Sequence, residues 1–112
     1  MKDEDKILIV NELLELAKQS KLNKSQKNKI LKIIENLDAT EIQKERFIIY
    51  YGFNDNNIKF GNLTKIAKLY GCTMSTVRAS VISVRIKLIR LNEECEIIKE
   101  IVNECKKDMY EI

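Results

Sequence analysis

The chain has no proline and no histidine, and only three of its 112 residues are glycine. Proline and glycine interrupt helices most often, so their scarcity predicts an almost entirely helical protein. Without histidine and without a Cys-x-x-Cys pair, a zinc site is not expected. There is also no glycine-rich phosphate loop and no carboxylate pair in an apolar setting. We therefore expect neither enzymatic activity nor a bound cofactor.

Features of export or membrane insertion are also missing. The N-terminal sequence MKDEDK lacks a signal-peptide profile, and no apolar run approaches the length of a membrane span. The three cysteines, Cys72, Cys95 and Cys105, have the spacing of reduced, buried thiols. These features predict a soluble cytoplasmic protein without membrane contact. Its length is sufficient for a single domain with one core.

Acidic residues are absent between Asn62 and Arg90, a segment that contains six basic residues. The net charge of the whole chain is only +3, so the positive charge is concentrated in this segment. A local positive field of this kind attracts a polyanion such as DNA. A second acid-free run, from Lys18 to Lys32, has two interpretations: further phosphate contacts, or a solvated linker and helix face.

Apolar periodicity divides the first half of the chain into three predicted helices, at about 3–20, 25–37 and 40–52. Asn23 or Ser25 is the expected cap of the second helix. The third opens with a capping-box pattern formed by Thr40 and Gln43, and Gly52 is expected to end it.

The acid-free segment has the pattern of a helix-turn-helix. Ala67 supplies the small residue where two helices cross, and Gly71 tolerates the positive φ of the turn. Cys72 closes the corner, while Val77 and Val81 fix the second helix to the core. Such a second helix enters the major groove of DNA.

The predicted DNA contacts fall into two groups. One lies on the second helix and faces base edges, with the apolar members directed at thymine methyl groups: Met74, Ser75, Thr76, Arg78, Ala79, Ile82 and Ser83. The other consists of basic residues expected to contact phosphates, which position a protein without specifying sequence: Lys65, Lys68, Arg85 and Lys87.

The block 37–91 resembles region 4 of bacterial sigma factors, which reads the −35 promoter element. The matching residues are Glu45, Arg46, Phe47, Tyr51, Gly52, Phe53, Leu63, Ile66, Ala67, Gly71, Cys72, Thr73, Val77 and Arg78. The chain departs from the family at positions that make base contacts, with Met-Ser-Thr at 74–76 and Ala79. The resemblance therefore implies the scaffold and a DNA-binding role, but not the usual −35 preference.

The same resemblance implies a possible protein partner. In sigma factors, the region matching the third helix and the following loop faces the flap of the RNA polymerase β subunit, so RNA polymerase is a candidate partner. The aromatic residues there also have two other interpretations: a stacking platform for single strands or, as helical spacing favours, core packing. They are Phe47, Tyr50, Tyr51 and Phe53.

Beyond the turn, the pattern predicts one uninterrupted helix of roughly 50 Å. Its apolar residues recur at alternating steps of four and three: Val77, Val81, Val84, Leu88, Leu91, Cys95, Ile98, Val102, Cys105, Met109 and Ile112. We call these residues the heptad stripe. One interpretation is a coiled-coil seam that forms a homodimer. The other is that residues 5–37 fold back over the stripe within one chain.

These observations together predict a single all-α domain of three parts: an N-terminal helical pair (1–37), a helix-turn-helix of the sigma region 4 type (38–91) and a C-terminal helical extension (92–112). The expected function is that of a transcriptional regulator that binds double-stranded DNA. The alternative is an adaptor that binds RNA polymerase or a sigma factor without reading DNA.

Overall fold

Helices form the whole regular structure of the described residues, which are 1–54 and 61–110 of the computed structural model, with side chains described up to 107. The all-α prediction is therefore confirmed for this part of the chain, which contains no strand. The helices are α1 (Asp3–Lys18), α2 (Lys24–Glu35), α3 (Glu41–Tyr51), α4 (Leu63–Tyr70), α5 (Met74–Ile89) and α6 (Glu93–Tyr110).

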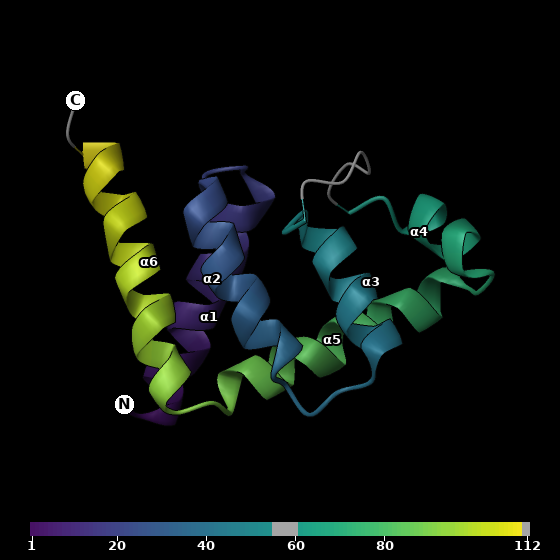
Figure 1. Ribbon diagram of the computed structural model, residues 1–112, viewed down its shortest axis with the longest axis horizontal. Helices are drawn as coiled ribbons and strands as arrows, with labels where there is room; N and C mark the ends of the chain where they lie inside the picture. Colours follow the sequence, from purple (N-terminus) through teal and green to yellow (C-terminus); the bar gives the residue numbers. More distant parts are fainter. Residues whose placement is uncertain (55–60, 111–112) are drawn as a thin grey trace.

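Helix α5 passes beneath α2, α3 and α4 and connects the two ends of the molecule (Figure 1). It packs against α1, α3 and α4, whereas α6 packs against α1 and α2. Figure 1 places α4 and the start of α5 at the end of the molecule opposite α6. The helix-turn-helix thus stands at one end of a body that measures 42 × 31 × 21 Å.

The helix boundaries follow the predicted caps closely. The Thr40 hydroxyl accepts a hydrogen bond from the backbone N–H of Gln43, whose side chain accepts one from the N–H of Thr40, both at 3.2 Å. Gly52 ends α3 in the left-handed conformation, with a φ of 75°. Asn23 and not Ser25 caps α2, through a reciprocal pair of bonds with Gln26. These caps depend on residues close together in the sequence, and each forms as predicted.

The prediction of one continuous helix to the C-terminus was wrong. Helix α5 ends at Ile89, and α6 begins at Glu93 after a short connection. The Asn92 side chain accepts a hydrogen bond from the Lys6 ammonium group of α1, which anchors the connection. Three glutamates in the first turn of α6 suit the positive end of its helix dipole. This run of acids directly after an asparagine is the start signal that the heptad pattern obscured.

The break allows the chain to cover its own heptad stripe. Every member from Val77 to Cys105 is buried except Leu91, which is half-buried. The side chains of Met109 and Ile112 lie outside the described residues. Helix α1 packs on both α5 and α6, and α2 packs on α6. The interpretation that residues 5–37 fold over the stripe is therefore correct, and the stripe is not an open dimer seam.

Three of the four aromatic residues around the end of α3 form part of the core. Phe47 and Phe53 are buried, with ring centroids 6.0 Å apart. The ring of Tyr51 lies 4.8 Å from that of Phe47, centroid to centroid. Burial raises the pKa of Tyr51 to about 12. Core packing is thus the correct interpretation of these three rings, while Tyr50 is half-buried beside them.

Two adjacent isoleucines of α6 provide a matched test of this packing. Ile98 is completely buried, whereas the side chain of Ile97 is 40% exposed. We expect Ile98→Ala to lower the free energy of unfolding by about 2–5 kcal/mol, because it leaves a cavity in the core. We expect Ile97→Ala to change it by less than about 1 kcal/mol. Urea unfolding measures both values. A midpoint that rises with protein concentration would contradict burial within one chain and indicate a dimer seam.

Candidate nucleic-acid interface

The connection between α4 and α5 is built by caps on both helices. The side chain of Asn62 accepts a hydrogen bond from the backbone N–H of Lys65, at 3.0 Å, at the start of α4. Gly71 ends α4 with a φ of 62°, which a residue with a side chain rarely adopts. The Thr73 hydroxyl then accepts a bond from the backbone N–H of Thr76 and caps α5.

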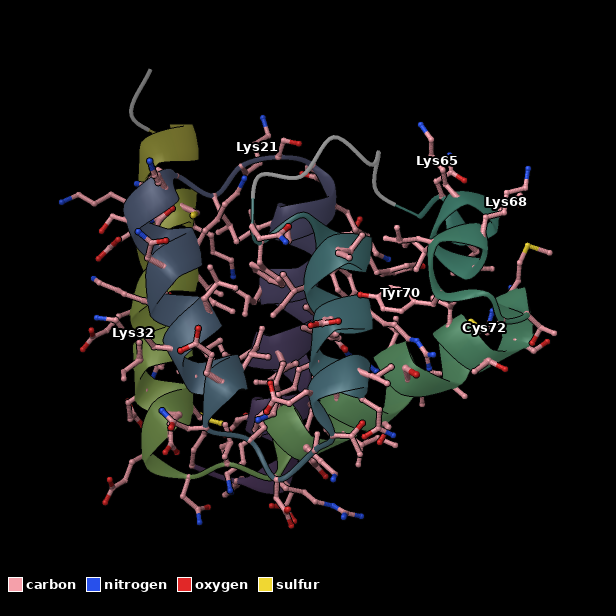
Figure 2. The ribbon with its side chains drawn as sticks, turned by 45° about the vertical axis from the view of Figure 1, so that its right-hand side comes forward. Lys21, Lys32, Lys65, Lys68, Tyr70 and Cys72 are labelled. Atoms are coloured by element: carbon pink, nitrogen blue, oxygen red, sulfur yellow. The ribbon has the colours of Figure 1, made fainter. Side chains whose placement is uncertain are left out.

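The two helices cross where the sequence predicted. Ala67 of α4 is buried, as are Val77 and Val81 of α5. The backbone N–H of Cys72 donates to the carbonyl oxygen of Ala67, at 3.0 Å, and closes the corner. Figure 2 shows Cys72 at this corner, between the two helices. A small residue at the crossing allows the close approach that a helix-turn-helix requires.

A polar cluster fixes the orientation of this helix pair on α3. The Tyr70 hydroxyl of α4 donates to the Glu45 carboxylate of α3, at 3.1 Å. The Arg46 guanidinium lies 5.1 Å from the centroid of the Tyr70 ring and donates to the Ser80 hydroxyl of α5, at 3.0 Å. Figure 2 shows Tyr70 directed from α4 toward α3. Arg46 thus contacts both helices of the motif.

One side of α5 faces away from the core. Its buried side is formed by Val77, Val81, Val84 and Leu88, together with Ser80. The opposite side is exposed. Each of its residues precedes one of the four buried apolar residues by two positions: Ser75, Ala79, Ile82 and Ile86. We call these four residues the outer stripe. Helical periodicity places them on one line.

The structure brings most of the predicted base-contacting residues to this exposed side. Met74, Ser75, Thr76, Arg78, Ala79 and Ile82 are exposed, and Ser83 is half-buried at its edge. The Thr76 hydroxyl lies 2.9 Å from that of Thr73, so it belongs to the cap as well. Ile86 was not among the predicted contacts, although it follows Ile82 by one helical turn.

Two predicted phosphate contacts point elsewhere. The Arg85 side chain is half-buried, and its Nε atom is fully buried. Its positive charge lies near Tyr51 and partly opposes the rise in the pKa of Tyr51. The Lys87 ammonium group donates to the backbone carbonyl of Asp38, in the connection before α3. The structure therefore directs both side chains toward the body of the molecule. Sequence charge alone does not reveal this, because their partners are distant in the chain.

The two lysines of α4 lie where phosphate contacts were predicted. Lys65 and Lys68 are exposed, and Figure 2 shows both side chains projecting away from the body. The Thr64 hydroxyl lies 3.3 Å from the Met74 sulfur, which places the first turn of α4 beside the start of α5. By contrast, Lys32 of the second basic run lies on α2, on the opposite side of the molecule in Figure 2. Lys32 therefore does not extend the surface formed by α4 and α5.

Comparison of the chain with protein-family models, curated proteins and solved structures found no match. Within the described ranges, no helix is both long and apolar enough to cross a membrane. The same residues contain no group of three or more Cys, Asp or Glu side chains placed to hold a metal ion. The surface formed by α4 and the exposed side of α5 is the candidate site.

The hydrogen bond between Tyr70 and Glu45 should be measurable in the stability of the protein. We expect Tyr70→Phe, which keeps the ring beside Arg46, to lower the free energy of unfolding by about 0.5–1.5 kcal/mol. Leu69→Ala, at an exposed leucine of the same helix, is the control. Chemical unfolding of the two variants and the wild type measures the difference.

The effect of Tyr70→Phe should also depend on pH. Burial, followed by the hydrogen bond to Glu45, raises the pKa of Tyr70 from 10.0 to about 12. The protonated hydroxyl is therefore stabilised by folding, and this stabilisation is complete below the unfolded pKa. We expect the stability difference between wild type and variant to be constant below pH 10 and to shrink between pH 10 and 12. A difference that grows over this interval would contradict the assignment.

Proposed function

We propose that this protein is a DNA-binding transcriptional regulator that inserts α5 into the major groove of double-stranded DNA. The observation that carries the proposal is the exposed side of α5, which begins beside α4 at one end of the molecule and belongs to a segment without acidic residues. Anionic phosphates are attracted by such a segment, and no carboxylate within it repels them.

The geometry supports a division of roles. Lys65 and Lys68 of α4 hold phosphates beside the groove, and Arg78 near the start of α5 reaches base edges. Arginine pairs bidentately with guanine and is the most common specific reader of bases. Arg46 and Tyr70 support these residues indirectly, since they hold α4 and α5 in a fixed relation to α3. Neither Arg85, which is half-buried, nor Lys87, which is hydrogen-bonded to the Asp38 carbonyl, is assigned a role in this proposal.

A second candidate function is that of an adaptor which binds RNA polymerase or a sigma factor without reading DNA. The observation in its favour is the exposure of large apolar side chains on α5, including Met74 at 48% and Ile82 at 43%. The buried aromatic rings of α3 do not serve such a contact. The two functions differ in the salt dependence of DNA binding, because only phosphate contacts release counterions.

Fluorescence anisotropy with a random-sequence duplex tests the proposal directly. We expect binding by the purified protein without polymerase, and we expect it to weaken as salt rises. If Lys65 and Lys68 hold phosphates, the slope of log K against log [salt] should be about −2, since each phosphate contact contributes about −0.9. Lys68→Ala should weaken binding to all sequences alike and reduce the size of the slope by about one.

Lys32→Ala is the matched control, because it removes an exposed lysine on the opposite side of the molecule. We expect this variant to bind as the wild type does. An equal loss in both lysine variants would mean that attraction is diffuse and that α4 and α5 form no site. Absence of binding at low salt by the folded protein would rule out autonomous DNA binding and favour the adaptor.

A further inference from the structure

The outer stripe of α5 carries exposed apolar side chains, which contacts with phosphates do not need. Ile82 and Ile86 are 43% and 40% exposed, and Ala79 lies between Ser75 and Ile82 on the same line. Met74 adds a further exposed apolar side chain at the start of the helix. These residues are not needed for the core, since Val77, Val81, Val84 and Leu88 supply the buried side. Their exposure therefore requires a separate explanation.

The residues missing from α5 restrict which bases it can read. Its sequence, MSTVRASVISVRIKLI, contains no Asn or Gln and no Asp or Glu. Asn and Gln are the side chains that pair bidentately with adenine, and the acids accept hydrogen bonds from cytosine. Helix α5 therefore lacks the usual readers of adenine and cytosine. Hydroxyl groups, one outward arginine and apolar side chains remain.

The thymine methyl group is the apolar feature that a base pair presents in the major groove. An exposed isoleucine or methionine that covers this methyl removes apolar surface of both partners from water. Cytosine, the other pyrimidine, carries no methyl at this position. The outer stripe thus has the chemistry to select thymine, and Arg78 beside it has the chemistry to select guanine.

We propose that α5 recognises A·T-rich duplex DNA by covering thymine methyl groups with Met74, Ala79, Ile82 and Ile86. Arg78 reads a guanine within or beside this run. This inference rests on the proposed function and specifies its target. The positive segment around the stripe favours DNA as the occupant, because no acidic residue between Asn62 and Arg90 repels phosphates.

Replacement of thymine by uracil tests the inference, because it removes only the methyl group. A random duplex library is first enriched on the wild-type protein, and the selected duplex is synthesised with thymine or with uracil. We expect the selected sequences to be rich in thymine. We expect uracil to weaken binding about fourfold for each methyl that the protein covers, from about 0.8 kcal/mol for each buried carbon. Salt dependence should persist on both duplexes.

Two variants identify the side chains responsible. We expect Ile82→Ser to lose the discrimination due to the methyl that Ile82 covers, a reduction of about fourfold, from about 0.8 kcal/mol for one buried carbon. Leu69→Ser, at a 61% exposed leucine on α4, is the matched control and should keep the full discrimination. Both positions are exposed, so the substitutions should leave the fold intact, which circular dichroism checks.

The outcomes separate this inference from the proposed function. Salt-dependent binding with equal affinity for both duplexes, or selection without enrichment in thymine, would overturn the inference alone. Unchanged discrimination in Ile82→Ser would also overturn it and would assign the outer stripe to a protein partner. Absence of any duplex binding would overturn the inference and the proposed function together.

Discussion

The burial of one side of α5 holds the helices of this protein together. A helix of 16 residues is marginal in water when isolated, so its stability must come from packing. The apolar contacts of Val77, Val81, Val84 and Leu88 with α1, α3 and α4 provide that packing. The same contacts leave the opposite side of α5 exposed. One apolar interaction therefore fixes the helix and determines which residues a ligand can reach.

The other features of the fold serve this arrangement. The break before α6 lets the chain turn back, so that α1 covers apolar residues of α5 and α6 together. Arg46 and Tyr70 then fix the angle between α3, α4 and α5 through directional polar contacts that apolar packing does not supply. Arg85 and Lys87 are used within the body of the protein. The cations available to a ligand are consequently fewer than the composition of the segment indicates.

The sequence predicted many of the helix boundaries, because caps and turns depend on residues that are close together in the chain. The cap at Thr40, the stop at Gly52 and the turn at Gly71 act within a few residues, and the structure confirms each of them. The break before α6 was missed because the heptad pattern continues across it. Lys87 is hydrogen-bonded to the Asp38 carbonyl and Arg85 lies near Tyr51, and both neighbours are distant in the chain. Periodicity identified the exposed side of α5 but not which basic side chains turn inward.

Titration of the isotope-labelled protein with duplex DNA, monitored by backbone amide NMR shifts, would show which helix contacts the duplex. We expect the shifts to concentrate on α4 and the first three turns of α5, including Ser75, Ala79 and Ile82. The chemical shifts of the amides of α2 and α6 should stay unchanged. Shifts centred on α2 or α6, or no shifts at a DNA concentration well above that of the protein, would contradict the claim that α5 is the DNA-binding helix.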